Sequence, residues 1–180
     1  IESGIAKGID LSIKYRGKKL YIWFAYSLGD ITRNDNDFIY YPHFDRRHNS
    51  NLVASYNFGR NNSWKTDLRW NLGSGFPFTQ TKGFYENLTF SQGINTNYNS
   101  NSGELGIEYA ELNEGRLPYY HRLDISISKE LKINKKSIIN INASITNIYN
   151  RQNIFYFNRI EYERVNQLPL MPSVGISMSF

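Results

Sequence analysis

The sequence predicts an all-β fold, namely an antiparallel transmembrane β-barrel, of which the 180 residues would supply about seven strands. Three observations lead to this prediction. Apolar and polar residues alternate one by one in segments of about ten residues, as they do along the strands of membrane barrels. The connections between these segments are alternately short and long. The polar positions carry charged residues as well as Ser and Asn, which a water-filled lumen accepts and a packed core does not.

The first four segments show this alternation clearly. The first has Ile9, Leu11 and Ile13 on one face, and the second has an aromatic or aliphatic residue at every second position. The third alternates apolar residues with Asn and Ser. In the fourth, Trp and Leu alternate with charged residues such as Asp67 and Arg69, so that one face is strongly polar. We therefore expect strands at residues 4–15, 19–29, 48–58 and 64–73.

The last three segments repeat the pattern in the carboxyl-terminal part of the chain. Ile125 and Ile127 alternate with Asp124 and Ser126, and the following segment alternates Ile with Asn and Ser. The final segment ends on Phe180, after apolar residues that are separated by Ser or Gly. We expect these strands, each antiparallel to its neighbours, at residues 120–132, 136–147 and 171–180.

Neighbouring positions on a strand face opposite sides of the sheet, so the alternation also predicts two faces. The apolar face should carry Leu68, Trp70, Ile125, Ile141 and Ile176. The polar face should carry Asp67, Arg69, Asp124 and Asn142.

The lengths of the connections predict how the barrel is oriented. Short turns near residues 16–19, 59–63 and 132–136 lie on the same side as Phe180, and long links lie on the other side. Outer-membrane barrels have short periplasmic turns and longer extracellular loops, so the short-turn side should be periplasmic. The long links are residues 29–48, 74–119 and 148–170.

Aromatic residues near the short turns indicate a girdle at the boundary between lipid and water. Any one of these residues could be an ordinary aromatic of a β-sheet, so the indication comes from the set. The set is Tyr15, Tyr56, Phe58, Trp64 and Phe180.

The chain is expected to be one part of a larger barrel. Seven antiparallel strands cannot close on themselves, because the first and the last would run parallel and leave two unpaired edges. The sequence also begins at Ile1, with neither an initiator Met nor an export signal. We expect the missing strands to precede it.

Composition argues against several other classes of protein. The chain has no Cys, so it offers neither a disulfide framework nor a thiolate metal site. The longest mostly apolar stretch, residues 20–28, is far too short for a membrane-spanning helix. The net charge of +5 comes from Lys and Arg residues scattered through turns and alternate strand positions. We therefore expect solvated turns and a polar lumen, and no binding of nucleic acid.

The pattern His43, Asp45 and His48 has a spacing that could be mistaken for a metal site. Two neighbouring cations, Arg46 and Arg47, disfavour a divalent metal. We expect instead that Asp45 pairs with Arg46 or Arg47 and orders the return of the loop to the barrel. We expect no metal, no cofactor and no catalytic residue.

Five segments, taken in order, resemble the carboxyl-terminal barrel region of TonB-dependent receptors, most closely those of Bacteroidota. The resemblance covers essentially the whole chain. A single segment such as SGFPFT is weakly specific for this family, whereas five segments in the right order and spacing are a strong indication of it. The segments are YPHFDRRHNSNLVASYNFG (41–59), NLGSGFPFTQTKGFY (71–85), RLPYYHRLDISIS (116–128), NASITNIYNRQNIFYF (142–157) and LPLMPSVGISMSF (168–180).

This resemblance implies a location, a function and a set of partners. Residues 1–180 would form the carboxyl-terminal part of the barrel of a bacterial outer-membrane transporter, embedded in outer-membrane lipid. The family has a barrel of 22 strands, an amino-terminal plug domain and a TonB-box segment that contacts the TonB complex. The transporter would capture a small extracellular ligand and import it as a scarce nutrient, such as a ferric siderophore. Neither the plug nor the TonB box lies in these residues.

Two groups of residues are candidates for function within that framework. Aromatic residues in the long links suit stacking on a ligand, although these links could equally pack on one another. Three charged residues of the polar face could contact the plug, or could form a plain ion pair of the barrel wall. The ligand-binding candidates are Tyr40, Tyr41, Phe84, Tyr85 and Tyr98, and the plug-facing candidates are Arg69, Arg122 and Asp124.

Two other functions remain open from the sequence. The barrel could be a porin or an adhesin that works without TonB, or, less readily, a barrel hydrolase. No Ser–His–Asp set has a convincing spacing, so we expect that the protein is not an enzyme. A plug domain upstream of this segment would favour transport.

Overall fold

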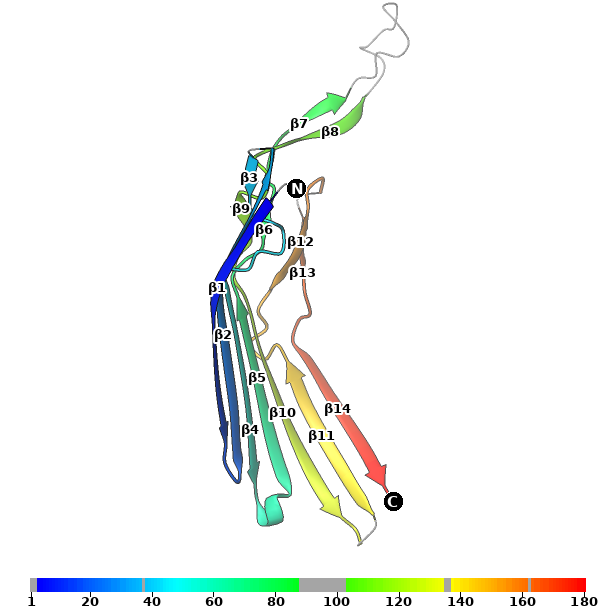
Figure 1. Ribbon diagram of the computed structural model, residues 1–180. Coiled ribbons are helices and arrows are strands. Elements are labelled where there is room, and N and C mark those ends of the chain that lie inside the picture. Colours follow the sequence, from blue (N-terminus) through cyan, green and yellow to red (C-terminus); the bar gives the residue numbers. More distant parts are fainter. Residues whose placement is uncertain (1–2, 37, 88–102, 135–136, 162) are drawn as a thin grey trace, which may run out of the picture.

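The computed structural model describes residues 3–36, 38–87, 103–134, 137–161 and 163–180. Seven long strands form one sheet in chain order, and each is antiparallel to its neighbours (Figure 1). This arrangement confirms the predicted strand map. The strands are β1 (Ser3–Arg16), β2 (Leu20–Asp35), β4 (His48–Phe58), β5 (Trp64–Gly73), β10 (Tyr120–Lys132), β11 (Ile138–Thr146) and β14 (Met171–Ser179).

The long links contain short strands that the sequence analysis did not predict. The second strand is also longer than expected, because β2 continues beyond Gly29 to pair with β1 and with the short β3. The remaining short strands form three small two-stranded sheets, β6 with β9, β7 with β8, and β12 with β13. Their bounds are β3 (Phe38–Tyr40), β6 (Pro77–Phe78), β7 (Thr81–Asn87), β8 (Glu104–Tyr109), β9 (Gly115–Arg116), β12 (Ile154–Asn158) and β13 (Glu163–Asn166).

Helix plays little part in the described residues. A 3-10 turn, η1 (Arg60–Asn62), joins β4 to β5. Asn61 and Asn62 in this turn have positive φ, a conformation that Asn adopts more readily than most residues. No helix of the described residues is long and apolar enough to cross a membrane.

The strand register confirms the two predicted faces. Leu68 is the partner of Ile125, and Ile141 is the partner of Ile176, so these apolar residues share one face. On the other face, Arg69 lies opposite Asp124. A shift of one residue in the register of a strand would turn its apolar residues to the polar face. The registers of these strands are therefore the ones that the alternation predicts.

The apolar face is not covered by any other part of the described chain. No hydrophobic residue there is buried, and the buried residues with polar side chains are Asp45, Ser50, Ser74, Asn147 and Asn153. Ile9 is 71% exposed and Ile176 is 73% exposed. A soluble domain of this length would bury its large aliphatic side chains. The apolar face is therefore open to whatever surrounds the protein.

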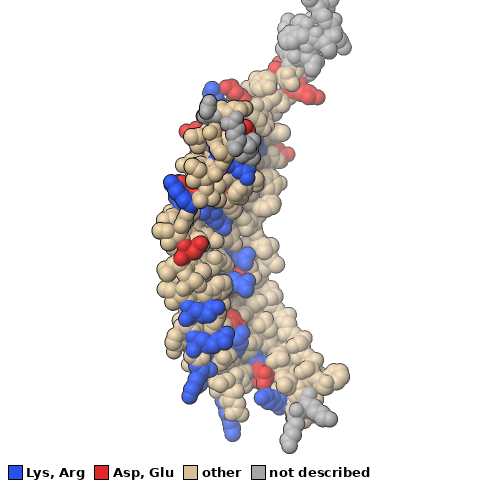
Figure 2. Space-filling model, viewed as in Figure 1, with Lys and Arg blue, Asp and Glu red and all other residues tan. Residues whose placement is uncertain are grey.

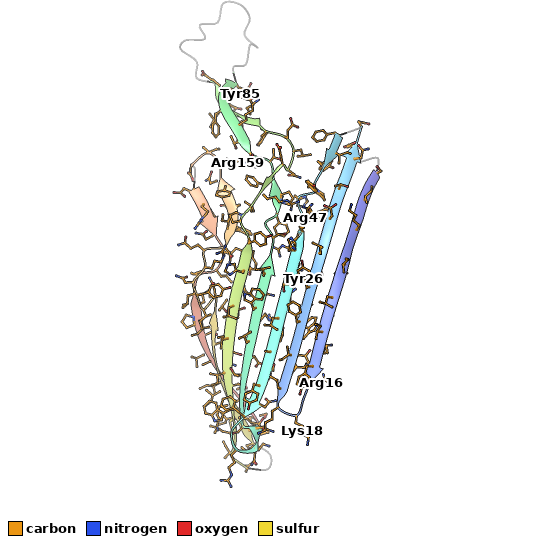
Figure 3. All side chains as sticks on the ribbon, turned by 90° about the vertical axis from the view of Figure 1, so that its left-hand side faces the viewer. Arg16, Lys18, Tyr26, Arg47, Tyr85 and Arg159 are labelled. Carbon is orange, nitrogen blue, oxygen red and sulfur yellow. The ribbon has the colours of Figure 1, made fainter. Side chains whose placement is uncertain are left out.

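The two ends of the sheet differ as the connection lengths predicted. The three short turns and the carboxyl terminus lie at one end, and the small hairpins lie at the other (Figure 1). Figure 3 shows Arg16 and Lys18 at the short-turn end and Arg159 and Tyr85 at the hairpin end. Figure 2 shows Lys and Arg side chains spread along the sheet and around its short-turn end. Between β1 and β14 the described sheet is open.

Candidate functional site

The segment of residues 41–47 forms a strap that folds over the hairpin end of β2. The Asp45 backbone N–H donates to the Pro42 carbonyl at 2.9 Å, and the Gly29 N–H donates to the Arg47 carbonyl at 2.9 Å. Asp45 is fully buried, and its carboxylate forms an ion pair with Arg116. The same carboxylate accepts a hydrogen bond from the Ile31 N–H at 3.3 Å. The strap is thereby tied both to β2 and to β9.

The expectation that Asp45 pairs with Arg46 or Arg47 was wrong. Arg47 turns toward the sheet and pairs with Asp30, with 2.7 Å between Nη2 and Oδ1, and this hydrogen bond raises the pKa of Arg47. Arg46 lies over the ring of Phe76, 4.2 Å from its centre, and burial lowers the pKa of its guanidinium. Successive side chains of the strap point in different directions, so the partner of Asp45 comes from a distant segment.

Gly73 leaves the space in which the Arg46 side chain lies. A Cβ atom at position 73 would sit 2.5 Å from the guanidinium carbon of Arg46. Any other residue there would push Arg46 off the Phe76 ring. The strap and the end of β5 are thus fitted to each other.

The two histidines of the strap region do not meet. The His43 ring packs edge-on against Phe44, with 5.3 Å between ring centres. The His48 Nδ1 atom shares a hydrogen bond of 2.8 Å with the Tyr26 hydroxyl on the apolar face. Within the described residues no group of three or more His, Cys, Asp or Glu side chains is arranged to hold a metal ion.

Two of the three predicted charged residues of the polar face, Arg69 and Asp124, line a hollow in the sheet. Arg122 and Asp124 form an ion pair, with 2.9 Å between Nη2 and Oδ2. Arg69 lies opposite Asp124 on the neighbouring strand and has no hydrogen bond or ion pair with the described residues. The hollow has a volume of about 420 Å³ and is lined by Asp67, Arg69, Asp124, Ser126, Asn142 and Ser144, among others.

Asn147 is a buried connector that the sequence analysis missed. Its backbone N–H donates to Asp124 Oδ1 at 2.9 Å, which links it to the polar face. Its side-chain amide donates to the carbonyls of Arg151 and Leu168 and accepts from the Arg151 N–H, at 2.9, 3.0 and 3.0 Å. It is 0% exposed and has a φ of 55°. The Thr-Asn-Ile-Tyr-Asn stretch in which it lies carried the only sequence signal.

An aromatic cavity lies at the hairpin end, between the β6 and β7 segments and β12. Its volume is about 540 Å³. Phe84 lines it, as do Phe78 and Phe157, whose ring centres are 6.2 Å apart. Arg159 lies at its wall, over the Tyr109 ring at 5.1 Å, and its Nη1 atom is buried without a hydrogen-bond partner in the described residues. The cavity combines flat apolar surfaces with one cation, a combination suited to stacking on a ligand that carries negative charge.

The structure does not bring the four described ligand-binding candidates together at one place. Phe84 lines the aromatic cavity, whereas its neighbour Tyr85 is 54% exposed on the β7–β8 hairpin. Tyr40 belongs to β3, and the Tyr41 ring lies under Arg116, 5.0 Å from the guanidinium carbon. Tyr98 lies outside the described residues. The run Phe155-Tyr156-Phe157 supplies much of the cavity wall and is an aromatic cluster that the sequence itself shows.

Comparisons with known proteins do not place the chain in a family. No family model, no curated protein and no solved structure matches it.

Proposed function

We propose that the chain forms part of the wall of a transmembrane β-barrel in the bacterial outer membrane, and that this barrel is a TonB-dependent transporter. The observation that carries the membrane part of the proposal is the uncovered apolar face. A sheet whose large aliphatic residues are all solvent-accessible loses the main favourable term of folding unless lipid covers them. The opposite face, with its charged residues, then lines a polar lumen.

The dimensions of the apolar face support this proposal. The seven long strands have between 9 and 16 residues, and about 9–11 residues suffice to cross a bilayer at a tilt of about 45°. Aromatic rings border the face at the short-turn end, where Tyr56, Phe58 and Trp64 stack with centres 6.0 Å apart. At the other end, the pair of Tyr26 and His48 forms a second border.

The distance between these two borders fits a bilayer. His48 and Tyr56 lie eight residues apart on β4. At about 3.3 Å per residue they are about 26 Å apart along the strand, which is about 20 Å along the barrel axis for a tilt of about 40°. The lipid-facing band of outer-membrane barrels is about 25 Å tall. The two borders would therefore lie near the two membrane surfaces.

The proposal that further strands complete the barrel rests on the sheet edges. Among the described strands, β1 pairs with β2 alone and β14 with β11 alone. An unpaired strand edge is costly within the hydrocarbon region, because its backbone N–H and C=O groups find no water there. Strands from the rest of the protein would satisfy both edges.

The transport part of the proposal rests on the resemblance of five segments to TonB-dependent receptors and on the hollows of the polar face and the hairpin end. In that arrangement Arg69, Arg122 and Asp124 face the plug domain, and Arg69 is free to pair with it. The aromatic cavity lies on the extracellular side and takes part in capturing a scarce nutrient such as a ferric siderophore. The TonB complex would supply energy through a segment that precedes this chain.

Uptake measurements in the parent cell test this proposal. The gene of the full-length protein is deleted, and uptake of iron-loaded siderophores is compared with that of the parent and of a strain lacking TonB. We expect the two mutants to lose the same uptake activity. Uptake that survives loss of TonB or collapse of the proton gradient would favour a porin. A full-length protein that does not insert into lipid vesicles would defeat the membrane assignment itself.

A further inference from the structure

A second cavity lies at the hairpin end of the sheet, next to the apolar face. It has a volume of about 480 Å³ and is formed by the start of β10, the segment of residues 149–154 and β13. It is distinct from the aromatic cavity and shares no lining residue with it. Its polar lining residues include Tyr119, His121, Tyr149, Arg151, Gln152 and Arg164.

The charge of this cavity is positive. Arg151 and Arg164 both line it, and no acidic residue of the described part of the chain does. Neither guanidinium forms an ion pair with a described residue. Arg151 donates from Nη2 to the Tyr119 carbonyl at 2.8 Å, and its Nε atom is buried without a hydrogen-bond partner in the described residues. Arg164 donates from Nη2 to the Gln152 side-chain oxygen. Two cations with spare donors therefore share one cavity.

The cavity begins where the apolar face ends. His121 lies opposite Leu72, on the same face as Leu123 and Trp70. The His121 Nδ1 atom shares a hydrogen bond of 2.8 Å with the Tyr149 hydroxyl. A molecule with an apolar part against Leu123 and Trp70 would thus present its polar end to the cavity.

Buried hydrogen bonds hold the cavity in shape before anything binds. The Asn153 side chain donates to the His121 carbonyl at 2.9 Å and accepts from the His121 N–H at 3.1 Å, so that it continues the β10 edge as a strand would. Asn153 is 4% exposed. A site whose groups are fixed in advance loses less entropy on binding than one that has to be ordered.

We infer that this cavity binds the phosphate of a lipid head group whose acyl chains lie along the apolar face. The inference rests on the proposed lipid contact of that face. Arg is suited to this task, because its planar guanidinium donates two parallel hydrogen bonds to a phosphate. A lipid is favoured over a free anion because the cavity continues directly into the apolar surface. The site would recognise anionic lipids of the leaflet at the hairpin end.

Binding of a lipid to the purified full-length protein tests the inference. The protein is first inserted into neutral phosphatidylcholine vesicles and then titrated with a bis-phosphorylated glycolipid, with its dephosphorylated form and with inorganic phosphate. We expect saturable binding of the phosphorylated lipid, and binding at least about tenfold weaker for the other two ligands. Equally tight binding of inorganic phosphate would overturn the lipid assignment.

Two variants assign the binding to the cavity. Arg164→Gln removes the charge from a side chain whose one hydrogen bond to a described residue is with Gln152, and we expect it to weaken binding about tenfold or more. Lys129→Gln is the matched control, because Lys129 lies on the same face at the short-turn end, 4.5 Å from the centre of the Trp64 ring. Equal affinities in both variants and the unchanged protein would overturn the site. Failure of the unchanged protein to insert into the vesicles would instead overturn the lipid contact and the inference with it.

Discussion

Asp45 and Arg116 lie 71 residues apart in the chain and form an ion pair in which the carboxylate is fully buried. The guanidinium is 30% exposed, so the two partners do not depend on each other equally. Loss of the cation would leave a buried charge without a partner, whereas loss of the carboxylate would leave a cation that water can reach. The pair joins the strap of residues 41–47 to β9 and so couples two long links.

Arg116→Met is predicted to be the more damaging change in this pair. Removing the cation from a buried carboxylate costs about 3–5 kcal/mol. Asp45→Asn should cost less, because an amide oxygen can still accept the hydrogen bond from the Ile31 N–H. Hydrogen exchange of the Ile31 amide and limited proteolysis of the strap would measure the loss of stability in both variants. Arg47→Met is the control: it breaks a half-exposed pair and should change little.

Asn147→Ala is predicted to destabilise the full-length protein by about 2–4 kcal/mol. The substitution leaves the N–H and carbonyl of Arg151 and the carbonyl of Leu168 without the buried side chain that satisfies them. Urea titration of the protein in lipid vesicles would measure the loss. Asn150→Ala, also at positive φ, removes one exposed hydrogen bond to the Leu170 N–H and should cost much less. Equal losses would contradict the role of Asn147.

Ile141→Arg is predicted to cost more than Asn142→Arg although the residues are adjacent. Ile141 lies on the apolar face, opposite Lys129, and Asn142 lies on the polar face. An Arg facing lipid costs about 2–4 kcal/mol at the bilayer midplane and less near its surfaces, whereas an Arg in the lumen is solvated. Because Ile141 lies beside Lys129 toward the short-turn end, we expect a difference of about 1 kcal/mol. Urea titration in vesicles would compare the two variants. Equal costs would contradict the assignment of the faces.

Leu68→Ser is predicted to cost less than about 2 kcal/mol, because no cavity opens when lipid can fill the vacated space. A Leu inside a packed protein core loses about 3–5 kcal/mol when it is truncated. Leu68 lies between Ala54 and Ile125 in the middle of the apolar face, so it is a suitable probe. A large loss in vesicles would indicate that protein, and not lipid, covers this face.

Phe157→Ala is predicted to weaken capture of the proposed extracellular ligand by about tenfold, because it removes a stacking wall of the aromatic cavity. Binding of a labelled ligand to intact cells would measure the effect. Tyr85→Ala is the control, since that ring is exposed on the β7–β8 hairpin and lines no part of the cavity. A larger effect for Tyr85 would move the ligand site to the hairpin.

The long strands were predictable because their signal is local. Alternation with a period of two is visible within ten residues, and it determines both the strand and its face. The β6–β9 pair has no such signal: each strand has two residues, and Pro77 and Arg116 meet only because the neighbouring long strands bring them together. Its existence follows from the folded sheet and not from either segment.

The candidate site was predictable in composition but not in its contacts. Arg122 and Asp124 lie two residues apart on one strand, so their shared face and ion pair could be foreseen. The partner of Asp45 could not, because proximity in the sequence favoured Arg46 and Arg47 over a residue that arrives from a distant link. Asn147 is one of many Asn residues, and the Thr-Asn-Ile-Tyr-Asn stretch around it does not show which of its Asn residues is buried.

The two free edges of the sheet determine how copies of it could associate. Strands β1 and β14 run in the same direction (Figure 1). With their apolar faces on one side, two copies could form an antiparallel seam only between like edges, related by a two-fold axis. The hairpins of one copy would then lie beside the short turns of the other, and both membrane surfaces would carry long loops. Such a two-fold pair would not give the one-sided mouth of the proposed barrel, so in that proposal the flanking strands are expected to come from another segment of the protein.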